Sequence, residues 1–155
     1  MQSKMSGIKS VLICLLLVLY SQGITSCKEH SERYEYHKDI KKYQELLKED
    51  PKNCFYNEQL AASYQGINNI DKAIEHYRFV VENCPDNLIS IFDLGVCYLV
   101  KMDREKALKY MNKAIAEAHK RKEIKLERMF IRSKSEWLQK WESIKKLEWN
   151  AGKKK

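Results

Sequence analysis

The sequence predicts an all-α fold, a short α-solenoid of about two helical hairpins with flanking helices that cap the stack. Two observations support this prediction. The 155 residues include only 5 glycines and 2 prolines, and no segment alternates apolar and polar residues as a strand does. In addition, segments 54–87 and 88–121 align with each other at an offset of 34 residues. A chain of this length accommodates one domain and is too short for a two-domain enzyme.

Residues 1–26 have the pattern of a secretory signal peptide. Lys4 and Lys9 precede the apolar run 11–20, and small polar residues follow it. The apolar run is shorter than the ~20 residues that a transmembrane helix needs. An uncleaved membrane anchor is the alternative interpretation.

The signal-like segment ends in Ile24-Thr25-Ser26-Cys27, which resembles the bacterial lipoprotein box. This resemblance implies that Cys27 becomes the new N-terminus and carries fatty acyl chains such as palmitate. Two or more chains anchor a protein stably in a bilayer. We therefore expect a lipid-anchored protein of the bacterial outer membrane, on the periplasmic face or the cell surface, with residues 27–33 as a tether.

The first predicted helix, 33–49, begins the helical-repeat region at 34–119. Its apolar residues recur at helical spacing. They are Ile40, Tyr43, Leu46 and Leu47. The helix ends before Pro51, and it matches the second helix of a hairpin whose first helix is missing.

The two aligned segments predict four helices, at 54–67, 70–83, 88–101 and 104–119. Leu60, Ala61 and Tyr64 align with Leu94, Gly95 and Tyr98, and residues 71–74 align with 105–108. Small residues at these positions allow two helices to approach closely, and tyrosines fill the space between them. The turns 50–53 and 84–87 both contain proline and are also 34 residues apart.

This pattern of small and aromatic residues with a 34-residue period resembles the tetratricopeptide repeat. The resemblance implies a stack of antiparallel helix pairs that binds protein partners. The sequence departs from the family pattern at Asn57, where tryptophan is frequent, and at Met111, where an aromatic residue is expected. His119 stands where the second repeat would end in proline, which leaves that helix free to continue past 119.

In the tetratricopeptide family, one face of each first helix lines a concave groove. The resemblance assigns to this groove Phe55, Glu58, Ala62 and Gln65 from one repeat, and Ile89, Phe92, Val96 and Leu99 from the next. Helix 88–101 is apolar on nearly every side, so it must be buried or covered. Either the C-terminal helix caps it or the groove binds an apolar peptide or helix, and both hold if the cap covers only part of the groove.

The excess of positive charge is confined to residues 120–155, which contain 13 lysines and arginines and 5 acidic residues. Residues 28–119 contain 14 basic and 16 acidic residues. Apolar residues at spacings of three, four and seven predict an amphipathic helix at 121–148 that includes Trp137 and Trp141. This helix has three interpretations. It packs on the repeats, it presents tryptophan to a protein partner, or it rests on anionic headgroups.

The sequence contains no motif of an enzyme active site. The four histidines are scattered without metal-ligand spacing, so we expect no metal, cofactor or small-molecule substrate. An exported lipoprotein does not meet nucleic acid, so we expect none as a partner.

Of the five cysteines, Cys14 leaves with the predicted signal peptide and Cys27 is expected to carry lipid. Three others remain, Cys54, Cys84 and Cys97. We expect Cys97 in the core. Cys54 and Cys84 flank one hairpin and come near each other, and an exported compartment permits a disulfide. The sequence leaves this bond open, and its demanding geometry weighs against it.

The sequence therefore predicts a membrane-anchored tetratricopeptide scaffold or adaptor that binds a protein or peptide in the bacterial cell envelope, without catalysis. The alternative function is a peripheral protein that organises membranes through its basic amphipathic C-terminal helix.

Overall fold

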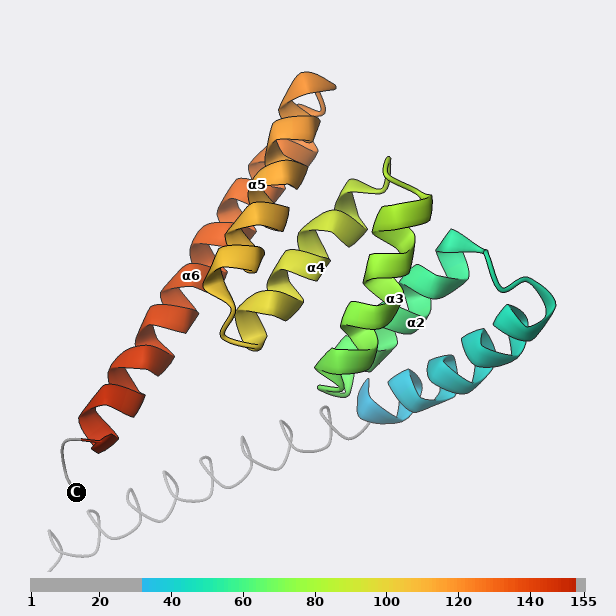
Figure 1. Ribbon diagram of the computed structural model, residues 1–155, viewed down its shortest axis with the longest axis horizontal. Helices are drawn as coiled ribbons and strands as arrows, with labels where there is room; N and C mark the ends of the chain where they lie inside the picture. Colours follow the sequence, from blue (N-terminus) through green and yellow to red (C-terminus); the bar gives the residue numbers. More distant parts are fainter. Residues whose placement is uncertain (1–31, 153–155) are drawn as a thin grey trace, which may run out of the picture.

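A computed structural model describes residues 32–152, which form six helices and no strand (Figure 1). A helix over 32–49 precedes α2 (Cys54–Gly66) and α3 (Ile70–Asn83). α4 (Leu88–Val100) and α5 (Arg104–Lys120) form the second hairpin, and α6 (Ile124–Gly152) follows. The predicted all-α, tetratricopeptide-like solenoid is confirmed. The predicted signal peptide and Cys27 lie outside the described residues.

The helix bounds agree with the predicted ones to within one residue except in α6. This helix begins at Ile124 rather than 121 and runs to Gly152 rather than 148. No helix among residues 32–152 is long and apolar enough to cross a membrane.

Asparagines cap the first helix of each hairpin. The Asn53 side chain accepts a hydrogen bond from the Tyr56 amide, and Asn87 does the same for the Ser90 amide. Such caps satisfy amides that have no partner within the helix. The matching turns 50–53 and 84–87 therefore start equivalent helices.

The turn within each hairpin contains one residue with a left-handed backbone conformation. It is Asn68 in the first hairpin, with φ 61°, and Met102 in the second, with φ 62°. In both turns the following residue donates its amide back to a tyrosine carbonyl, from Asn69 to Tyr64 and from Asp103 to Tyr98. This bonding closes the last helical turn.

The α5–α6 turn has the same geometry. α5 ends at Lys120, one residue past His119, and does not run on into α6 without a break. Lys122 has φ 58°, and the Glu123 amide donates to the Ala118 carbonyl at 3.0 Å. A helix can therefore end here without proline, because the left-handed residue redirects the chain.

The core has two neighbouring clusters. The first joins the 32–49 helix to the α2–α3 hairpin through Ile40, Tyr43, Leu60 and Tyr64. The second joins α4, α5 and α6. Gly95 brings α4 and α5 close together, because a Cβ there would lie 2.8 Å from Met111 Cγ and 2.9 Å from the Ala107 carbonyl oxygen. Cys97 lies in the core, as expected, and burial raises its thiol pKa to about 12.

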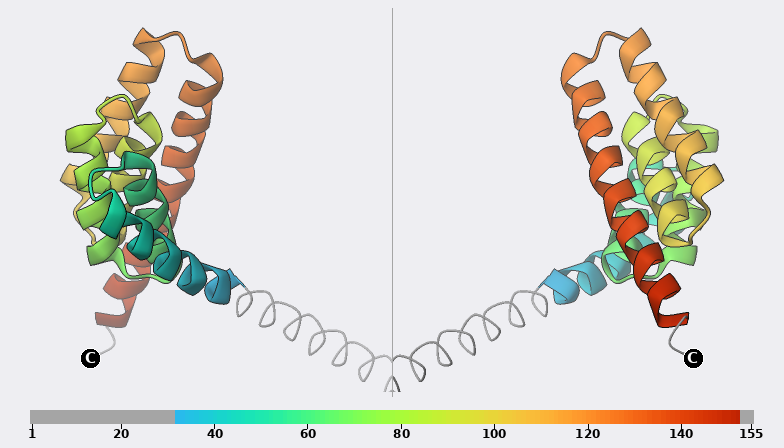
Figure 2. Two further views of the ribbon diagram at one scale, coloured as in Figure 1. Left: turned by 90° about the vertical axis from the view of Figure 1, so that its right-hand side faces the viewer. Right: turned by 90° about the vertical axis from the view of Figure 1, so that its left-hand side faces the viewer.

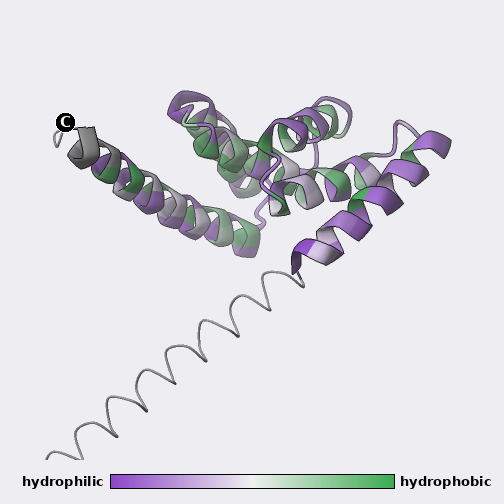
Figure 3. Ribbon diagram, turned by 90° about the horizontal axis from the view of Figure 1, so that it is seen from below, coloured by the Kyte–Doolittle hydropathy of each residue, from purple (hydrophilic) through white to green (hydrophobic). Residues whose placement is uncertain are grey.

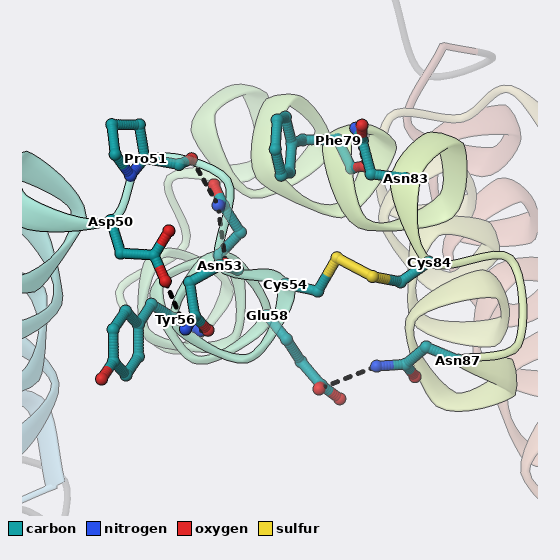
Figure 4. The surroundings of a disulfide bond; sticks show 11 residues. Asp50, Pro51, Asn53, Cys54, Tyr56, Glu58, Phe79, Asn83, Cys84 and Asn87 are labelled. Atoms are coloured by element: carbon teal, nitrogen blue, oxygen red, sulfur yellow. Dashed lines mark hydrogen bonds between the residues drawn. A yellow bond between two sulfur atoms is a disulfide. The ribbon is translucent and has the colours of Figure 1, made fainter.

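Cys54 and Cys84 form a disulfide between the start of α2 and the end of α3 (Figure 4). The expectation that geometry weighs against this bond is wrong. The two helices of the hairpin are antiparallel, so these residues lie at the same end, with Cα atoms 6.4 Å apart. That distance is within the ordinary range for a disulfide.

α6 runs along one side of the stack, antiparallel to α5 (Figures 1 and 2). The two views of Figure 2 show its C-terminal part continuing beyond the other helices on the lower side of the molecule. The start of the 32–49 helix points toward the same side.

Replacing both disulfide cysteines, Cys54→Ser with Cys84→Ser, should lower the free energy of unfolding by about 3 kcal/mol, because the unfolded chain loses a closed loop. Urea unfolding followed by circular dichroism measures this change. Reductant should destabilise the natural chain to a similar degree and leave the double variant unaffected. An equal effect of reductant on both proteins would contradict the assignment.

Candidate partner-binding surface

The concave face predicted from the repeat register is closed over α4. Phe92, Val96 and Leu99 are buried, with exposed fractions of 4%, 2% and 2%. α6 covers them, and the rings of Phe92 and Phe130 stack with centroids 4.6 Å apart. A partner therefore cannot reach these three residues while α6 stays in place.

Trp137 and Trp141 pack against the same apolar cluster and are half-buried. The Lys140 ammonium lies 4.9 Å from the centroid of the Trp137 ring, and the Arg104 guanidinium lies 5.6 Å from that of Trp141. These tryptophans contribute to the cap over α4. Of the three interpretations of this helix, packing on the repeats therefore fits α6 as far as Trp141. The indole Nε1 of Trp141 is buried and has no hydrogen-bond partner in the described part of the chain.

The α2 half of the predicted groove is open. Phe55 is 57% exposed, Ile89 at the start of α4 is 47% exposed, and Ala62 is also exposed. Glu58 and Gln65 are half-buried. The structure therefore divides the predicted groove residues into an accessible set around α2 and an inaccessible set on α4. Binding of a partner to the accessible set stays a prediction.

The exposed Phe55 is supported by aromatic neighbours. Its ring centroid lies 6.4 Å from that of Tyr43 on the 32–49 helix and 6.0 Å from that of Tyr56 on α2. Contacts of this kind hold an apolar side chain in one position at the surface.

Two carboxylates stand where α4 faces α2 and α3. Glu58 accepts a hydrogen bond from Asn87 Nδ2 at 2.8 Å, which links α2 to the cap of α4 (Figure 4). Burial, and then the Glu58 charge, raise the pKa of Asp93 to about 6. A hydrogen bond from the Tyr77 side chain to the Asp93 carboxylate partly offsets this increase in pKa.

Sequence reasoning missed Asp93 as a residue of this surface. The sequence did contain a feature that could have identified it, because Asp93 is the only charged residue in the largely apolar α4. A charge at such a position is rarely buried without a partner.

Within residues 32–152, no group of three or more histidine, cysteine or acidic side chains is arranged to hold a metal ion. His76 is half-buried beside Asn57, whose Oδ1 lies 2.9 Å from His76 Nδ1. Burial lowers the pKa of His76. Its ring stacks on Tyr64, with centroids 5.7 Å apart, so its contacts are those of a packed hairpin residue.

The paired helices, the repeated turns and the concave face define a tetratricopeptide-like helical-repeat protein. No family model matches the chain, and no curated protein matches it in sequence. Among solved structures, the chain is similar to the crystal structure of MamA, a tetratricopeptide-containing protein, with a TM-score of 0.55 and 25% identity. The match covers 57% of this chain and 52% of that chain, so it spans about half of MamA.

Replacing Asp93 with asparagine should stabilise the fold at pH 7 by about 3 kcal/mol, and by less near pH 4.5. The folded-state pKa of about 6 is above the ordinary value of 3.8, so the ionised carboxylate destabilises the fold above pH 6. That cost is relieved as the pH falls from about 6 toward 3.8. Urea unfolding at the two pH values measures the difference.

The matched control is Glu105→Gln, which removes an exposed carboxylate from α5. It should leave the pH dependence of unfolding as in the natural chain. An Asp93→Asn protein whose stability changes with pH as the natural chain's does would contradict the raised pKa.

Proposed function

We propose that this protein is a lipid-anchored scaffold that binds a protein or peptide partner in the bacterial cell envelope and does not catalyse a reaction. The tetratricopeptide-like fold supports a role in protein–protein interaction. The lipoprotein-like box at Cys27 supports the anchor and the envelope location.

The observation that carries the scaffold proposal is the open half of the concave face around α2. Two large apolar side chains, Phe55 and Ile89, are exposed there, while carboxylates at Glu58 and Asp93 lie between α2 and α4. Apolar side chains beside charged groups suit a short peptide or helix that combines apolar and basic residues.

The disulfide supports an exported location. Disulfides persist in oxidising compartments such as the periplasm and are rare in the cytosol. The Cys54–Cys84 bond and the signal-like segment that precedes Cys27 therefore favour the same compartment.

A photo-crosslinking amino acid at position 55 or 89 should capture the same envelope protein in living cells, because both positions border the open half of the groove. The same amino acid at Ala116, an exposed position on α5, should not capture it. Mass spectrometry of the crosslinked product identifies the partner.

Phe55→Ser with Ile89→Ser should abolish recovery of that partner from the envelope without changing the circular dichroism spectrum. The matched control is Ile131→Ser, which removes an exposed apolar side chain from α6. Equal recovery by the groove variant and the control would refute the α2 surface as the binding site.

Cys27→Ser should move the protein from the membrane fraction to the soluble envelope fraction and remove the acyl mass from its N-terminal peptide. The reason is that a thiol accepts the lipid and a hydroxyl does not. Cell fractionation and intact-mass measurement test this prediction. Retained acyl mass in the variant would exclude Cys27 as the lipid site.

A further inference from the structure

The C-terminal part of α6 continues past the stack that its first part covers. α6 has 29 residues and the antiparallel α5 has 17, so α6 is 12 residues longer, or about 18 Å at ~1.5 Å per residue. Arg104, the first residue of α5, lies over the Trp141 ring. Residues 142–152, the α6 overhang, therefore extend beyond the start of α5 (Figure 1).

The α6 overhang exposes large apolar side chains. Ile144 is 48% exposed, Leu147 is 69% exposed and Trp149 is 67% exposed. In Figure 3, hydrophobic turns recur along α6 into its C-terminal half. Three such side chains in one short segment exceed what capping of the stack requires, because the apolar cluster under α6 ends at Trp141.

An apolar hollow of about 140 Å³ adjoins the α6 overhang. It lies between the end of α4 and α6, and Leu99, Val100, Met102, Trp137, Lys140, Trp141 and Ile144 line it. Tryptophan favours the membrane interface, where its ring is in an apolar region and acceptors are available to its N–H group.

The charge of the C-terminal segment indicates which kind of surface the α6 overhang can bind. Residues 140–155 contain six lysines and two glutamates, whereas residues 28–119 carry a small excess of acids. Lys145 and Lys146 are exposed on the α6 overhang. Tryptophan and leucine combined with lysine match an anionic lipid surface, where the apolar groups enter the headgroup region and the ammonium groups meet phosphates.

The position of the N-terminal helix agrees with this orientation. In both views of Figure 2, the start of the 32–49 helix and the end of α6 both lie in the lower part of the molecule, at opposite lateral edges. Residue 32 follows Cys27 by five positions. A lipid at Cys27, as the proposed function has it, would therefore hold the protein with the α6 overhang toward the bilayer.

We propose that the α6 overhang docks on an anionic phospholipid bilayer, with Ile144, Leu147 and Trp149 in the headgroup region and the lysines on lipid phosphates. This contact is separate from the lipid anchor. It orients the stack so that the disulfide end, with the open half of the groove, faces away from the membrane.

Tryptophan quenching by brominated phosphatidylcholine tests the proposal on the full chain reconstituted in vesicles. In vesicles that also contain phosphatidylglycerol, the natural chain should be quenched, and Trp149→Phe should lose most of that quenching. Lys145→Glu with Lys146→Glu should lose quenching in the same way. The matched control is Lys109→Glu with Lys113→Glu, which makes the same charge change at exposed positions of α5 and should leave quenching unchanged.

Three results would overturn the docking contact. They are unchanged quenching after Trp149→Phe, equal quenching in vesicles without phosphatidylglycerol, and photo-crosslinking from position 147 to a protein rather than to lipid. The acyl mass at Cys27 tests the proposed lipid anchor separately. A chain that keeps the acyl mass but shows no quenching of Trp149 would refute the docking contact alone, and the reverse result would refute the anchor alone.

Discussion

The need to enclose α4 determines how the rest of the chain is arranged. Nine of its 13 residues are buried, and they are distributed around the whole helix rather than along one face. A helix that is apolar on all sides is stable in water only when other elements surround it. α3 and α5 pack against α4, and α6 covers its concave side through the stacked rings of Phe92 and Phe130. This cover removes half of the groove that the repeat would otherwise present.

The two ends of the helical stack differ in how they are held. At one end the disulfide joins α2 to α3, Asn87 joins the cap of α4 to Glu58, and Arg121 Nη2 lies 2.7 Å from Asp86 Oδ1. These links connect successive hairpins and the α5–α6 turn. At the opposite end, the α6 overhang extends past its neighbours with apolar and basic side chains in water. One end is therefore closely linked, and the other has surface available for contact.

Much of the site was predictable, because the 34-residue offset identifies which residues face the groove. Phe55, Glu58, Ala62 and Ile89 were identified in this way and are accessible or partly accessible. Phe92, Val96 and Leu99 were identified by the same register but are buried, since the register describes a repeat and not the helix that follows it. Asp93 was missed, because its raised pKa comes first from burial between helices and then from Glu58, which is 35 positions away in the chain.

The sequence by itself determined the all-α class, the helix pairs and the turns, because these depend on residues within one repeat length. Small residues at the helix contacts, asparagine and aspartate caps, and turns spaced by 34 all act locally. Only the tertiary structure decided the Cys54–Cys84 bond, the burial of half the groove and the length of α6 that extends beyond the stack. Each of these depends on how far antiparallel helices run beside one another. Residue spacing along the chain does not specify that overlap.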